Sequence, residues 1–376
     1  MQHIYRNWKL ALLAAASVAL GCIGATQQSA QAQNSVAGWA DREDFTVLPS
    51  KDVKFNTRLT VLKRGTFESD EEEQKFTEFY TQSLFPNVTK PENRQSPKDD
   101  VTAKRDDVIT KLRSDFKSNE RAEDKQVFNK LTDLTLAYMS KIAKDGQYHP
   151  VARVNAMLAI GEVNSPKAVD ILLATLGDKN QIDAIRVAAM SGLVHLASQS
   201  CLSNPDAAQP VIVWMTKIVR APIPKNARAD GISWMRGQAA DVLAILRSTG
   251  SQNEVPPALL IMLNDKDLPI PLRSKAARAL GKLKYSDSPP VAGPYQTALA
   301  EFARDAMSGD QPANRKRVRL VARDVEEGLK PFPSPPLSNL LKVLIKDTED
   351  KLEPEELNAI IATAKASLDS FLKKKS

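Results

Sequence analysis

Residues suited to catalysis or metal binding are few in this chain. Its 376 residues include three histidines (His3, His149, His195) and two cysteines (Cys22, Cys201). A zinc site needs three or four neighbouring Cys, His or carboxylate ligands, and these residues are too scattered to supply one. Only His195 and Cys201 lie close in sequence. They could form a nucleophilic dyad, or they could be a packed imidazole and a small buried thiol.

The motifs that mark common enzyme classes are absent. The chain contains no Gly-x-Ser-x-Gly, His-Glu-x-x-His, Cys-x-x-Cys-His or glycine-rich phosphate-binding motif. Its carboxylates are numerous but scattered, as on solvated helix faces. We therefore expect a protein that is not an enzyme, with no catalytic residues, no cofactor and no metal.

Two basic groups are candidates for partner binding. Arg315, Arg319 and Arg323 recur every four residues, which places them on one helix face. That face could bind an acidic polymer, an anionic lipid head group or an acidic protein. Alternatively, it is a solvated surface balanced by three nearby acids: Asp324, Glu326 and Glu327.

An irregular segment at 219–232 is the second candidate binding element. Trp214 and Trp234 flank it, and aromatic side chains are common at interfaces. The alternative interpretation is that both tryptophans pack in the core. The segment itself carries three basic side chains: Arg220, Lys225 and Arg228.

Helices must position these residues, because apolar residues recur with helical spacing beyond residue 100. Val169, Leu172, Leu173 and Leu176 form one such stripe, and similar stripes begin at 211, 337 and 357. Aromatic residues make up only 6% of the chain, which favours helices over strands. Short Pro- and Gly-containing breaks separate the stripes and indicate antiparallel hairpins.

The helical region repeats itself. Residues 170–196 align without a gap on 257–283, and nine of the 27 positions are identical. The shared pattern is an arginine, then small residues at the third and sixth positions after it, then an aliphatic residue. It begins at four arginines: Arg153, Arg186, Arg236 and Arg273.

This pattern resembles the HEAT repeat, in the bacterial form called PBS-lyase HEAT-like, most specifically over about 150–284. In that family each unit is a helical hairpin with an acid in its turn and an arginine early in its second helix. Asp178 with Arg186, and Asp265 with Arg273, match that arrangement. The resemblance implies an armadillo-like α-solenoid over 99–376. The 50 residues between Arg186 and Arg236, and the proline-rich region 285–336, depart from the pattern.

Residues 33–98 differ from the rest and are expected to form a short irregular or partly β N-terminal arm and linker. Phe45–Leu48 and Val53–Leu62 suggest one or two strands or an extended arm, and Pro86–Asp100 a loop. Between them, the acidic run from Glu68 to Glu73 suits a helix N-terminus.

The first 32 residues predict a signal peptide. Arg6 and Lys9 precede an apolar run, and Ala30-Gln31-Ala32 is suited to cleavage. Retention of this segment as an anchor, or lipidation of Cys22, are the alternatives. No later segment is apolar enough to cross a membrane.

An exported protein, periplasmic or extracellular, is therefore expected. The formal net charge of +7 is mild for a chain of this length, and an exported protein rarely meets nucleic acid. Nucleic-acid binding is therefore not expected. The interpretation is a scaffold that binds a protein or polymer partner. Alternatives are an accessory subunit of an exported redox or lyase-type enzyme, or a structural component of the cell envelope.

Overall fold

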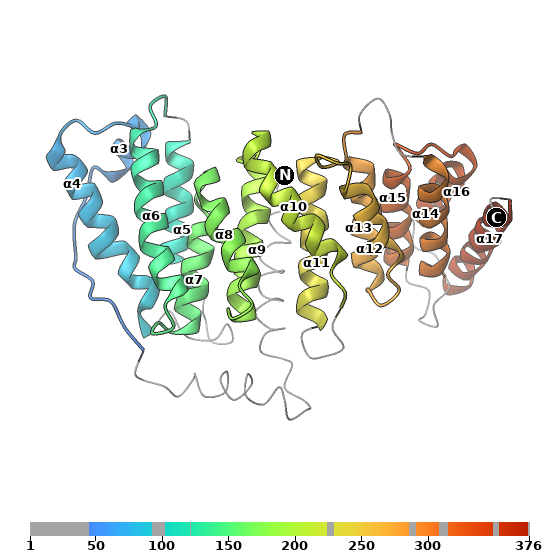
Figure 1. The fold of residues 1–376 in the computed structure, drawn as a ribbon, viewed down its shortest axis with the longest axis horizontal. Helices are drawn as coiled ribbons and strands as arrows, with labels where there is room; N and C mark the ends of the chain where they lie inside the picture. Colours follow the sequence, from blue (N-terminus) through green and yellow to red (C-terminus); the bar gives the residue numbers. More distant parts are fainter. Residues whose placement is uncertain are drawn as a thin grey trace. The chain divides into compact units, whose positions relative to one another are not determined.

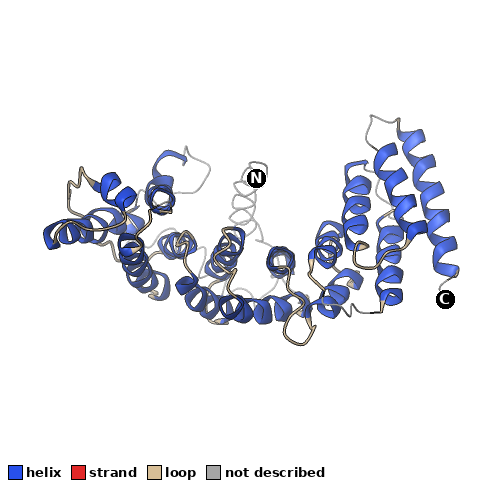
Figure 2. Cartoon of the chain, turned by 90° about the horizontal axis from the view of Figure 1, so that it is seen from above, coloured by secondary structure: helices blue, strands red, loops and turns tan. Residues whose placement is uncertain are grey.

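A computed structural model describes residues 45–91, 102–120, 122–223, 229–285, 291–307, 315–348 and 353–374. Every regular element in these ranges is a helix, as Figure 2 shows, and one isolated bridge joins Ser248 and Lys284. The all-α prediction is therefore confirmed. The chain divides into two compact units, Met1–Leu202 and Ser203–Ser376. The predicted signal peptide and Cys22 lie outside the described residues.

The first unit is a series of helices that pack on the next helix in sequence or on the one after it (Figure 1). The helix α7 contacts α5, α6 and α9, and α8 packs on α9. The described elements are α3 (Arg58–Arg64), α4 (Asp70–Glu78), a π-helical turn (Phe79–Leu84), a 3-10 helix (Phe85–Thr89), α5 (Thr102–Asn119), α6 (Gln126–Lys144), α7 (Pro150–Gly161), a 3-10 turn (Pro166–Ala168), α8 (Val169–Gly177) and α9 (Asp183–Ser198).

The second unit arranges its helices in two rows. One row runs α10, α12, α14 and the other α11, α13, α15, with contacts along each row and within each hairpin. The last hairpin is reversed, since α16 packs on α15 and α17 on α14. Its helices are α10 (Pro205–Arg220), α11 (Ala229–Leu246), α12 (Val255–Asn264), α13 (Ile270–Lys282), α14 (Ala292–Ala306), α15 (Arg315–Gly328), α16 (Pro335–Asp347) and α17 (Pro354–Lys373).

The predicted repeat is the best-anticipated part of the fold. Residues 170–196 fall on α8 and α9, and their counterparts 257–283 fall on α12 and α13. The apolar stripe of α8 is buried, as are Leu259 and Leu263 of α12. The proline-rich region 285–336 also contains paired helices, α14 and α15, which the sequence left unassigned.

The strand prediction for Val53–Leu62 is wrong from residue 58 onward, where α3 begins. Val61 and Leu62 are fully buried, and α3 packs on α5. Asn119 Nδ2 donates to the carbonyl of Leu62 at 2.6 Å, and Gly65 ends the helix with φ of 85°. These tertiary contacts override the β preference of the local sequence. Residues 45–57 form no strand or helix.

The buried carboxylate of Asp115 fixes α3 against α5. It accepts a hydrogen bond from the Tyr80 hydroxyl at 2.6 Å and pairs with Arg58. Burial is the largest influence on Asp115 and raises its pKa, against the opposing effect of both partners. Residues 58–89 are thus helical and packed within the first unit, where a short irregular or partly β N-terminal arm was expected.

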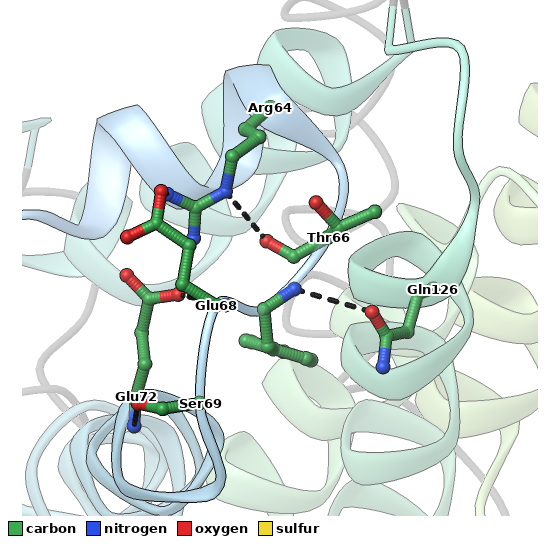
Figure 3. A network of polar contacts seen from close by, with 7 residues as sticks. Arg64, Thr66, Glu68, Ser69, Glu72 and Gln126 are labelled. Carbon is green, nitrogen blue, oxygen red and sulfur yellow. Dashed lines mark hydrogen bonds and ion pairs between the residues drawn. The ribbon is translucent and has the colours of Figure 1, made fainter.

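The acidic run does begin a helix, as expected. Ser69 caps α4, and its hydroxyl accepts from the backbone N–H of Glu72. Figure 3 shows how the preceding turn is secured: Arg64 Nε donates to the carbonyl of Thr66 at 3.0 Å, and the backbone N–H of Phe67 donates to Gln126 Oε1 at 3.1 Å. The second bond joins this turn to α6.

The loop predicted for Pro86–Asp100 is also corrected at its start. Residues 85–89 form a 3-10 helix in which Phe85, Pro86, Val88 and Thr89 are buried. The Thr89 hydroxyl accepts from the backbone N–H of Leu48 at 2.9 Å, which secures the chain before α3. Apolar contacts thus determine the structure here, although prolines suggested a linker. Residues 92–100 lie outside the described part of the chain.

Candidate functional site

The four repeat arginines make the same backbone contact. Each donates its Nε–H to a carbonyl at the end of the preceding helix, satisfying an acceptor that helix termini leave unpaired. The contacts are Arg153 to Ala143 at 3.1 Å, Arg186 to Leu176 at 3.1 Å, Arg236 to Val219 at 3.0 Å and Arg273 to Leu263 at 2.7 Å. We call these contacts the arginine locks.

The loop within the third hairpin differs in length but keeps the lock. Three locks join residues ten apart, whereas Arg236 and Val219 are 17 apart. The 50-residue spacing was expected to reflect either an insertion or an irregular repeat. The hairpin keeps its lock, and the extra residues lie in the connection between α10 and α11, as an insertion would place them. Residues 224–228, and therefore Arg228, lie outside the described residues.

Three of these arginines also reach a side chain of the following hairpin. Arg153 Nη2 donates to Gln181 Oε1 at 2.6 Å, and Arg236 Nη1 donates to Asp265 Oδ2 at 2.5 Å. Arg273 Nη2 lies 3.5 Å from Asp305 Oδ2. One planar side chain thus connects three successive helices or turns, which suits the fixed fork of a guanidinium.

The turn acids Asp178 and Asp265 have a local role as well. Oδ1 of each accepts the backbone N–H two residues later, at 2.9 Å from Asn180 and 3.1 Å from Asp267. Asp145 makes the same bond to Gln147 at 2.9 Å, and the sequence analysis missed it. The signal was available, because Asp145 precedes Arg153 by the same eight residues that separate the other pairs.

Glycines at the ends of the repeat pattern permit close helix packing. A Cβ added to Gly161 would lie 2.7 Å from Cα of Gly192, so α7 and α9 meet backbone to backbone. A Cβ added to Gly281 would lie 1.9 Å from the carbonyl oxygen of Glu327, between α13 and α15. The repeat residues therefore have structural roles, and a binding surface has to come from other side chains.

An open groove of about 500 Å³ lies on the second unit where α10 ends. We call it the α10 groove. Val213, which is 51% exposed, belongs to its lining, and the Lys217 ammonium lies 5.0 Å from the Trp214 ring centroid. Trp214 and Trp234 are both half-buried. The groove is lined by Val213, Thr216, Lys217, Arg220, Ala221, Pro222 and Glu254.

The predicted basic face lies on α15, which packs on α13. Arg323 is exposed, while Arg315 and Arg319 are half-buried. Two of the three acids expected to balance them have other partners: Asp324 Oδ2 accepts from the Ser274 hydroxyl at 2.7 Å, and Glu327 pairs with Lys282 and Lys330.

His195 and Cys201 have different partners. His195 Nε2 lies 3.1 Å from Asn164 Oδ1 and 3.8 Å from Glu162 Oε2. The Cys201 thiol lies 3.9 Å from the carbonyl of Gln199, and burial raises its pKa to about 11, which suppresses the nucleophilic thiolate. These contacts support the packed alternative over a dyad.

Glu162 is the buried centre of an ionic cluster, with a side chain 3% exposed. Arg113 donates to both carboxylate oxygens, at 2.9 Å from Nε and 2.6 Å from Nη2. Burial lowers the pKa of His195 below its ordinary value, although Glu162 opposes this effect and Arg113 adds to it. The cluster joins α5, the end of α7 and α9.

Within the described ranges, no three His, Cys, Asp or Glu residues are grouped to hold a metal ion. No described helix has the length and apolar character needed to span a bilayer. No protein-family model, no curated protein and no solved structure matches the chain.

Proposed function

We propose that this protein is an exported scaffold that binds a partner protein on the surface of a HEAT-like α-solenoid and catalyses no reaction. The observation that carries the proposal is the arginine lock. The same side chain, at the same place in four hairpins, makes the same bond to the preceding helix. Such repetition is typical of stacked repeats, whose usual role is to present an extended binding surface.

The exposed residues support binding. In the second unit, Val213 of α10 and Ile261 of α12 are each 51% exposed although they are aliphatic. The α10 groove adds two exposed cations beside Val213. Apolar side chains flanked by charge are typical of a protein-binding surface.

Export is supported by the N-terminal sequence alone. Positive charge, an apolar run and a small-residue cleavage site precede Gln33. Expression of the full chain in a bacterium tests this. The exported protein should begin at Gln33, as determined by intact mass, whereas lipidation would give a chain beginning at a modified Cys22. A full-length chain retained in the cytoplasm would contradict export.

The binding role is tested by affinity purification of a tagged full chain from the exported fraction after chemical crosslinking. We expect a partner in near-stoichiometric amount, identified by mass spectrometry. The test variant is Val213→Asp on the candidate surface, and its control is Val343→Asp on α16, because both valines are more than half exposed. An enzymatic turnover by the purified protein, abolished by one substitution, would contradict the proposal.

A further inference from the structure

We propose that the α10 groove binds an extended segment of a partner protein in which an aliphatic residue lies next to an aspartate or glutamate. This inference rests on the proposed function, because it identifies where the scaffold binds and what it recognises. It assigns the apolar contact to Val213 and the charged contacts to Lys217 and Arg220.

The apolar part of the groove is open to solvent. Val213 keeps half of its surface exposed, although neighbouring Met215 and Val211 on the same helix are fully buried. Ala221 and Pro222 continue the lining where the helix ends. These side chains form a solvent-exposed apolar surface, and an aliphatic side chain of a partner would bury that surface.

The charged part of the groove has an excess of positive charge. Lys217 and Arg220 are exposed and three residues apart, so both lie on the same side of α10. Arg220 Nη2 donates to the carbonyl of Glu254 at 2.9 Å, which holds the guanidinium at the groove. A guanidinium has five N–H donors, so others remain for a carboxylate.

Glu254 is the one acid in the lining, and its carboxylate has a local structural role. Oε2 accepts the backbone N–H of Gln252 at 2.8 Å in the turn before α12. The two cations therefore outweigh it, and an acidic ligand has the complementary charge. The groove is open and borders the end of a helix, which suits a chain passing through it better than a small molecule that would need enclosure.

Selection of a random dodecapeptide library displayed on phage, against the immobilised full chain, tests the recognition. We expect enriched sequences to carry Asp or Glu within three positions of Leu, Ile or Val. The most enriched sequence is then synthesised and measured by fluorescence anisotropy. A groove of this size should give a Kd on the order of micromolar. The affinity should fall as salt increases from about 50 to about 500 mM.

Two groove variants have matched controls elsewhere on the second unit. Val213→Asp and the double variant Lys217→Glu/Arg220→Glu should each weaken binding at least about tenfold. Val343→Asp and Lys342→Glu/Lys346→Glu make the same changes at exposed positions on α16 and should leave the Kd within about twofold. Circular dichroism confirms that every variant remains helical.

Three results would overturn the inference. Enriched peptides without acids, equal binding by the groove variants and their controls, or occupation of the groove by a second copy of the chain would each contradict it. A Val213-dependent dimer in sedimentation would show the last of these. The proposed function is judged separately. If both groove variants still recover a stoichiometric partner, the scaffold proposal stands and this groove is excluded as the binding site.

Discussion

Arg236 is the most deeply buried of the repeat arginines, with a side chain only 1% exposed. It binds the carbonyl of Val219 and the carboxylate of Asp265, whereas the Arg186 side chain is 20% exposed and pairs with Asp183 of its own helix. We therefore expect the same type of residue to contribute unequally to stability, with the more buried arginine contributing more.

We expect Arg236→Ala to lower the free energy of unfolding by about 3 kcal/mol, because it leaves a buried carbonyl and a carboxylate without their partner. Arg186→Ala should cost about 1 kcal/mol. Urea denaturation followed by circular dichroism measures both. Equal losses in the two variants would show that burial does not determine the strength of the locks.

His195 predicts a dependence of stability on pH. Burial lowers its pKa in the folded protein, so below about 6.5 the unfolded chain binds more protons than the folded one. The free energy of unfolding should therefore fall as pH falls from neutral through 6.5. In His195→Gln this component should vanish.

Urea midpoints at pH 7.5 and at pH 5 for the wild type and His195→Gln provide the measurement. The wild type should lose more stability than the variant on acidification. If the wild type instead gains stability relative to the variant, attraction between protonated His195 and Glu162 exceeds the cost of burial.

At the scale of helices, close packing of α7 on α9 depends on glycine. Gly161→Ala would place a Cβ 2.7 Å from Cα of Gly192, so the two helices must separate. We expect a loss of about 1–3 kcal/mol, as for overpacked cores. Gly231 of α11 is the control, since no atom lies within 4 Å of its added Cβ.

Gly231→Ala should be neutral or stabilising by up to about 1 kcal/mol, because alanine favours a helix more than glycine does. Thermal unfolding monitored by circular dichroism compares the two substitutions. A loss for Gly161→Ala no larger than the change for Gly231→Ala would mean that α7 and α9 are not in close contact.

Helices with a periodic apolar stripe were predictable, and those that depend on distant partners were not. Leu172 and Leu176 reveal α8 through their spacing alone. In contrast, α3 is seven residues long, and its burial depends on contacts with Asp115 and Asn119 of α5. The local sequence pattern does not predict contacts with residues so far along the chain. A short helix with β-branched residues near it therefore resembles a strand in sequence.

The location of the candidate site was predictable from the sequence, but its full lining was not. Trp214 and Arg220 indicated the end of α10, where the groove lies, although the expected irregular segment 219–232 also includes the end of α10 and the start of α11. Val213 was not anticipated, because its position in the lining depends on how α10 packs beside α12. The α15 face could be placed on a helix but not given a ligand.

At the scale of the whole molecule, the two units each have their own buried residues. In the second unit these include Met215, Leu243, Leu280 and Phe302, all fully buried. We expect a fragment containing residues 203–376 to fold alone, with helical circular dichroism and a cooperative thermal transition. A fragment that stays unfolded would show that the second unit requires the first.

The arginine locks have a consequence for how such a chain can change. Their acceptor is a peptide carbonyl, which every amino acid provides, so the residue at the helix end is free to vary. The lock also accepts loops of different length, as Arg236 shows. Because the arginine and its acceptor belong to the same hairpin, a duplicated or transplanted hairpin would carry its own lock. We therefore expect hairpins to be gained or exchanged while the lock inside each one persists.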